Sequence, residues 1–100
     1  MNQITQEAGS VQQPKKTDKE NAIELCKKAC IDAGEKGEDF SNGPCLLNPI
    51  PKQADWVCDI AHSPRQDVDN LPENQCSAFR DGTANHFVEL DEYCEIINVY

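Results

Sequence analysis

Residues 17–34 read TDKENAIELCKKACIDAG, and this stretch decides the fold. Thr17 and Glu20 fit a capping box, in which each side chain accepts a hydrogen bond from the other residue's backbone amide. Apolar and cysteine side chains then recur every three or four residues, which is the period of one helix face. Gly34 and Gly37 follow, and a glycine commonly ends a helix. The stretch therefore predicts a long amphipathic helix whose inward face holds Ala22, Ile23, Leu25, Cys26, Ala29, Cys30 and Ala33.

The middle of the chain predicts two extended segments and a short helix. Residues 45–47 are apolar and are soon followed by two prolines, which favours a strand at the edge of a sheet. Asn70 and Pro72 fit the cap and first turn of a short helix that ends near Arg80. Residues 56–62 alternate as a strand does, with one face formed by Trp56, Cys58, Ile60 and His62.

The last fifteen residues predict a β-hairpin. Its two strands are residues 86–90 and 95–100, with a turn between them. We therefore expect an α+β domain over residues 17–100, in which a long N-terminal helix packs on a small, mostly antiparallel sheet with this C-terminal hairpin and a second short helix. Residues 1–16 are polar and carry no periodicity, so they predict a disordered tail.

The charge of the chain restricts its partners. The formal net charge is −9, from 9 Lys and Arg against 18 Asp and Glu. Such a surface repels phosphate groups, so we expect no nucleic-acid partner and no binding to anionic membranes. The first residues lack the pattern of a secretory leader, and no apolar run is long enough to span a bilayer. These observations predict a soluble intracellular protein located in the cytoplasm.

Six cysteines in 100 residues are the main chemical feature. No two of them form a C-x-x-C pair, so the common zinc-ribbon and thioredoxin signatures are absent. Most fall on predicted apolar faces, where a free thiol behaves as a small hydrophobe, and we therefore favour buried free thiols with a structural role. The alternative is at least one disulfide, which would help so small a core. Cys26 and Cys30 could each then reach a thiol of the sheet, and Cys45 and Cys94 are well placed as outer partners.

A metal or thiol-redox site is a further alternative. Zinc prefers thiolate and imidazole ligands. Two of the candidates, Cys58 and His62, would lie about 13 Å apart on an extended strand, so zinc binding requires the chain to turn before His62. A redox thiol needs a lowered pKa, which the acidic surroundings oppose. We predict no cofactor, with zinc as the alternative, and its candidate ligands are Cys58, His62, Cys76, His86 and Cys94.

Acid–base residues gather at the end of the strand predicted at residues 56–62. In an enzyme, His62 would serve as a general base, Asp59 would orient it, and Arg65 would bind an anion. The motifs typical of phosphate-binding, dinucleotide-binding, serine-hydrolase and zinc-protease sites are absent from the sequence. We therefore expect a non-catalytic module that binds a protein partner, and the hairpin edge could also pair two copies.

Overall fold

The computed structural model describes residues 15–100, so most of the predicted tail, residues 1–14, lies outside the described residues. Described elements follow the α+β order that the sequence predicts. In chain order they are α1 (Asp18–Glu35), β1 (Cys45–Leu47), β2 (Trp56–Ile60), the 3₁₀ turns η3 (Asp67–Asn70) and η4 (Pro72–Asn74), α2 (Ser77–Arg80), β3 (His86–Leu90) and β4 (Ile96–Val99).

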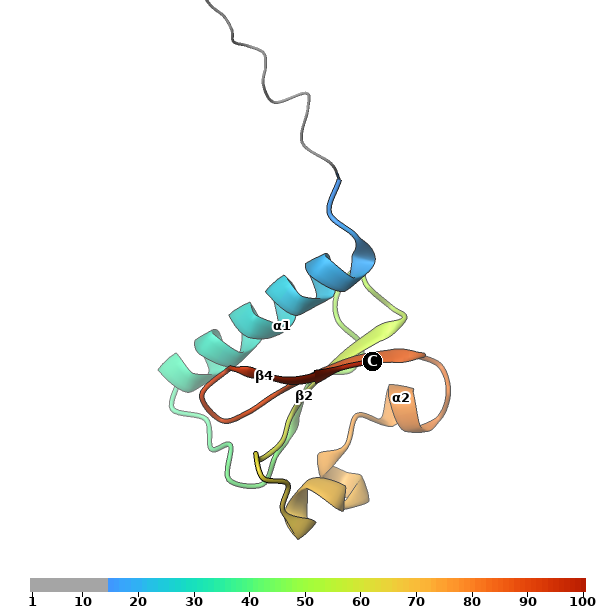
Figure 1. Ribbon diagram of the computed structural model, residues 1–100. Coiled ribbons are helices and arrows are strands. Elements are labelled where there is room, and N and C mark those ends of the chain that lie inside the picture. Colours follow the sequence, from blue (N-terminus) through green and yellow to red (C-terminus); the bar gives the residue numbers. More distant parts are fainter. Residues whose placement is uncertain (1–14) are drawn as a thin grey trace, which may run out of the picture.

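The elements form three layers. α1 lies across one face of the sheet, and α2 with the two 3₁₀ turns covers the other face (Figure 1). The strands stand in the order β1-β2-β3-β4, so β1 and β4 are the edges. A sheet between two helical layers must bury side chains on both faces, and the residues of β2 are accordingly buried at four of five positions.

The helix α1 begins and ends as its sequence predicts. Thr17 and Glu20 form the capping box, since the Thr17 hydroxyl accepts from the Glu20 amide at 3.1 Å and Glu20 accepts from the Thr17 amide at 2.8 Å. Gly37 takes the left-handed conformation, with φ at 80°, immediately after the helix. The buried positions are Ala22, Cys26, Cys30 and Ala33, whereas Leu25, which we predicted inside, is 36% exposed.

The sheet differs from the prediction in its central pair. β1 with β2 and β3 with β4 are antiparallel, but β2 and β3 are parallel, with Asp59 beside Glu89. The parallel pairing follows from residues 61–85, which cross the face opposite α1 and return the chain to the same end of the sheet. The predicted hairpin is confirmed, and Tyr100 extends it through two backbone hydrogen bonds to Phe87.

The predicted second helix is only partly correct. Instead of one helix from Leu71 to Arg80, the chain forms two 3₁₀ turns and a single α-helical turn, Ser77–Arg80. Gln75 and Cys76 between them are extended, with ψ at 151° and 116°. Cys76 is bonded to Cys45 of β1, so the segment is held against the sheet at the point where the helix was expected to continue.

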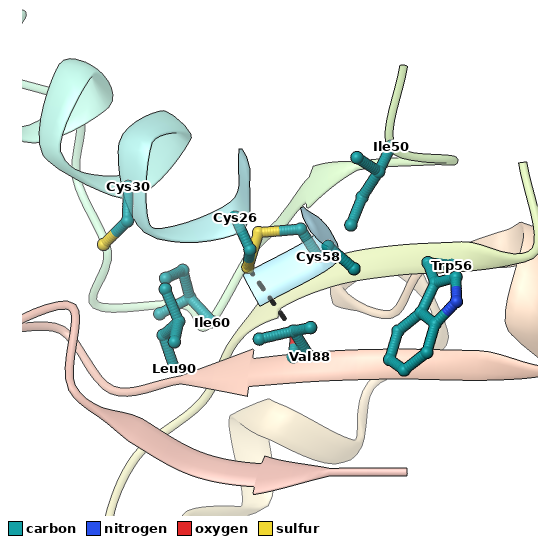
Figure 2. Close-up of a cluster of buried hydrophobic side chains, with 9 residues drawn as sticks. Cys26, Cys30, Ile50, Trp56, Cys58, Ile60, Val88 and Leu90 are labelled. Atoms are coloured by element: carbon teal, nitrogen blue, oxygen red, sulfur yellow. Dashed lines mark hydrogen bonds between the residues drawn. A yellow bond between two sulfur atoms is a disulfide. The ribbon is translucent and has the colours of Figure 1, made fainter. Parts of the chain in front are cut away.

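The main core lies between α1 and the sheet. Trp56, Cys58 and Ile60 of β2 point toward α1, as the two-residue period predicts, and meet Val88 and Leu90 of β3 (Figure 2). A smaller cluster on the other face contains Val57, Cys76 and Ala84, with Phe79 and Phe87 packed against it.

All six cysteines are paired, which corrects the preference for free thiols. Cys26–Cys58 joins α1 to β2 and Cys30–Cys94 joins α1 to the turn between β3 and β4. The third bridge, Cys45–Cys76, ties the opposite layer to β1. Disulfides persist in oxidising compartments and are rare in the cytosol, so the bridges argue against the predicted cytoplasmic location.

Within residues 15–100, no helix combines the length and the apolar character that crossing a bilayer requires.

Removing the Cys30–Cys94 bridge should cost several kcal/mol of stability. The double substitution Cys30→Ala and Cys94→Ala opens a bridge between residues 64 positions apart. We expect the free energy of unfolding to fall by about 3–4 kcal/mol, because the bridge removes chain entropy from the unfolded state even though the Cys45–Cys76 bridge shortens the loop that it closes. Guanidinium denaturation with the other bridges intact measures the difference. The control, Leu25→Ala with Ile31→Ala, removes half-exposed apolar groups from the same helix and should cost about 1 kcal/mol or less. An unchanged midpoint in the cysteine variant would contradict this role.

Candidate functional site

A pocket of about 320 Å³ lies between the sheet and the crossing segment, on the face opposite α1. Its floor comes from the three strands β2, β3 and β4, and its roof from the loop after β2, the extended residues that follow η4, and α2. The pocket is therefore a product of the crossover, because its roof is built entirely from residues 61–85. The residues that line it are Val57, Asp59, Arg65, Gln75, Cys76, Phe79, Arg80, Phe87, Glu89 and Asn98.

Two carboxyl groups lie next to each other on the floor. Asp59 of β2 is the register partner of Glu89 of β3, and Glu89 is in turn the partner of Asn98 of β4. Adjacent residues in paired strands project from the same face of the sheet, so these three polar groups form a row beneath the roof. Asp59 is half-buried and Glu89 is 8% exposed.

Asp59 is the electrostatically unusual residue of the pocket. Burial raises the pKa of its carboxyl group to about 8, and the negative charge of Glu89 adds to the effect, while Arg65 opposes it. Within the described part of the chain, Asp59 Oδ1 is the buried side-chain oxygen that finds no hydrogen-bond partner. At neutral pH the folded protein therefore holds a protonated carboxylic acid in this pocket.

Arg65 closes one end of the pocket and donates three hydrogen bonds there. Its Nη1 donates to Glu89 Oε2 at 2.9 Å, its Nε donates to the Asn70 side-chain oxygen at 2.8 Å, and its Nη2 donates to the Asp69 carbonyl at 3.3 Å. The guanidinium thus compensates Glu89 and secures the loop after β2, while Asp59 receives no direct bond from it.

His62 belongs to a different arrangement, centred on Asp69. A hydrogen bond of 2.9 Å joins His62 Nδ1 to Asp69 Oδ1, and the Asp69 carboxylate also accepts from the backbone amides of His62 and Gln66. Burial alone would raise the pKa of Asp69, but these hydrogen bonds outweigh it and hold the pKa below its ordinary value. Because Asp69 is 2% exposed and fixes both ends of its loop, we interpret the pair as structural support for the pocket wall.

The structure unites only part of the predicted site. Asp59 and Arg65 line one pocket, but His62 is not among the lining residues and contacts Asp69 instead. Sequence reasoning missed Glu89. A signal was present, because WVCDI and HFVEL each carry an acid at the fourth position, between two side chains of the core. The parallel register then places the two acids side by side.

The proposed zinc ligands are not gathered. Cys58, Cys76 and Cys94 each belong to a different disulfide, so none is a thiolate that could bind a metal. His86 stacks on Trp56, with ring centroids 4.6 Å apart. Among the described residues, no three His, Cys, Asp or Glu side chains are arranged to hold a metal ion. The sulfurs of Cys26, Cys30 and Cys58 are also inaccessible, which disfavours thiol exchange.

Comparisons with protein-family models, with curated proteins and with solved structures found no match, so the function of this protein has to be inferred from the geometry of its pocket and its disulfides.

Gly43 is required next to Asp69. It has φ at 61°, and a Cβ atom there would lie 2.2 Å from Asp69 Oδ1 and 3.1 Å from the Ile60 carbonyl oxygen. Gly43→Ala should therefore lower the free energy of unfolding by about 3 kcal/mol or more, since it adds a clash to the backbone strain. The matched control is Gly37→Ala, where φ is 80° but nothing lies within 4 Å, and strain alone should cost about 1–2 kcal/mol. Urea denaturation of both variants checks the ranking, and equal losses would contradict it.

The raised pKa of Asp59 predicts that the free energy of unfolding depends on pH. Between about pH 4 and pH 8 the unfolded chain ionises this carboxyl group whereas the folded protein retains its proton, so stability falls as pH rises through that window. Asp59→Asn removes the titration. We expect the variant to match the wild type near pH 4 and to exceed it at pH 9 by up to about 5 kcal/mol.

Denaturation curves at pH 4 and pH 9 measure this difference. Asp67→Asn, which changes an exposed acid in the neighbouring loop, is the control and should show no such divergence. A wild type and an Asp59→Asn variant that keep the same difference at both pH values would show that Asp59 titrates normally.

Proposed function

We propose that this protein is a disulfide-stabilised, non-catalytic binding module that acts in an oxidising compartment, outside the cytosol. It recognises a protein partner with the face of the sheet that carries the pocket. The observation that carries the proposal is the pairing of all six cysteines into bridges that fix both helical layers to the sheet.

The bridges support the compartment. Small domains with limited cores depend on cross-links where the surroundings are oxidising, and reducing conditions would remove that support. Here the bridges also determine the binding face, because Cys76 lines the pocket and its bond to Cys45 anchors the roof. Reduction would therefore loosen the binding face as well as the core.

The composition of the pocket supports binding rather than catalysis. It combines Phe79 and Phe87 with charged and amide groups, which is the mixture of apolar walls and a few polar groups typical of recognition sites. The base that a catalytic interpretation requires, His62, is buried against Asp69. The strong negative charge of the chain further favours a partner with a basic surface.

The expectation that two copies pair through the hairpin remains a prediction. β4 is an edge strand, and Ile96 at its start and Tyr100 just after its end are 44% and 66% exposed. An open strand edge of this kind can accept another strand.

Capture from the extracellular fluid of the source organism tests the proposed function. Thiol labelling first shows that the wild-type protein has no free thiol, and the oxidised protein is then immobilised. It should retain a protein, and reductant should release that protein. Asp59→Asn should retain it at least tenfold more weakly, because the pocket contributes to the contact. Asp67→Asn, with its change outside the pocket, should bind as the wild type does. If the oxidised wild type retains no protein, or if protein isolated from its source carries six reactive thiols, the proposed function is wrong.

A further inference from the structure

The pocket is lined by two acids and two arginines, but neither arginine donates a hydrogen bond to Asp59. Glu89 is matched by Arg65, whose three nitrogen atoms are all engaged. Arg80 lines the pocket as well, but its Nη1 donates to the Pro72 carbonyl at 2.9 Å and its Nε lies 3.9 Å from Asp81. Asp59 is left without an ionic partner inside a cavity wide enough for a ligand.

We propose that this pocket binds an organic cation, an ammonium or guanidinium group on an apolar stem, which takes the position of the missing partner of Asp59. In the context of the proposed function, on which this inference rests, the cation is a lysine or arginine side chain of the protein partner.

The geometry of the lining favours a cation over an anion. An anion on the floor would lie beside both Asp59 and Glu89, and Arg65 already donates to Glu89. A cation instead meets the row of Asp59, Glu89 and Asn98, all of which offer oxygen acceptors. Without such a partner the Asp59 carboxyl group keeps its proton, and an ammonium group beside it would stabilise the ionised carboxylate.

Two phenylalanines in the pocket lining explain why the ligand should carry an apolar stem. Phe79 and Phe87 contact each other edge to face, with centroids 5.0 Å apart, and both line the pocket. Aromatic faces attract cations and also pack against the methylene groups of lysine and arginine. The volume of about 320 Å³ lies at the lower end of the range of small-ligand pockets, about 300–1,000 Å³. A single side chain or a small amine fits this description better than a large ligand.

Release of the Asp59 proton makes cation binding measurable. A cation binds the ionised carboxylate, so below about pH 8 each binding event releases the carboxyl proton to solvent. The charged groups that face Asp59 are Glu89 on β3, Arg65 in the loop and Asp69 on η3, with Arg80 at the roof. Burial raises the pKa of Asp59 to about 8, whereas hydrogen bonds hold the pKa of Asp69 below its ordinary value.

Titration with small probes tests the site directly. n-Butylammonium, the end of a lysine side chain, should shift the backbone NMR signals of β2, β3 and α2, with the affinity rising about tenfold from pH 6 to pH 7 and levelling above pH 8. N-butylacetamide and butyrate, which are neutral and anionic, should not bind. Asp59→Asn should lose at least tenfold in affinity at pH 8 while the signals of α1 show it folded, and Asp67→Asn should bind normally.

The outcomes separate the possible ligands and the two proposals. Binding of butyrate in place of n-butylammonium, or cation binding that Asp59→Asn leaves unchanged, overturns the site. A lysine whose α-amino and α-carboxyl groups are both capped, with its side-chain ammonium free, should bind at least as well as n-butylammonium. If it is excluded, the ligand is a free amine and the side-chain version is wrong. If the wild type and Asp59→Asn retain a partner equally, the proposed function holds and the cation site is wrong. If the cation binds but no protein is retained, the cation site holds and the proposed function is wrong.

Discussion

The Cys26–Cys58 bridge is the bond on which the rest of this small domain depends. It joins the middle of α1 to the central strand β2, and both residues are completely buried. The inward face of α1 consists of small side chains, so the helix contributes little apolar area to the core. A domain of this size gains limited stability from burial alone. The bridge therefore supplies attachment that a larger leucine-rich helix face would supply by packing (Figure 2).

A disulfide also holds the layer of α2 and the two 3₁₀ turns to the sheet. The chain between β2 and β3 crosses the sheet, is held by the Cys45–Cys76 bridge, and returns parallel to β2. That route creates a covered face with a hollow beneath it, and it brings Asp59 and Glu89 into adjacent positions. An antiparallel hairpin would have needed no covering segment. The parallel central pair is thus the origin of both the pocket and its two acids.

Local signals accounted for much of the fold and less of the site. Thr17, Glu20 and Gly37 specify α1 because capping depends on neighbours in the chain. The alternation of residues 56–60 correctly placed Cys58 and Asp59 on opposite faces of the strand. Six thiols allow fifteen pairings, and nothing local selects among them. The parallel register is equally non-local, which is why Asp59 and Arg65 were recognised as candidates while Glu89 was not.

Disulfide support and an unpaired buried acid are connected physically. A carboxyl group with a pKa of about 8 lowers the stability of the folded protein at neutral pH. The free energy of unfolding of a protein domain is small, about 5–15 kcal/mol. Three cross-links that constrain the unfolded chain offset such a cost without filling the pocket with apolar side chains. Replacing Asp59 by an apolar residue would have been the simpler route to stability. Its presence in a framework that tolerates it supports the proposed binding site, since a carboxyl oxygen without a hydrogen-bond partner in the free protein is one that a ligand can satisfy.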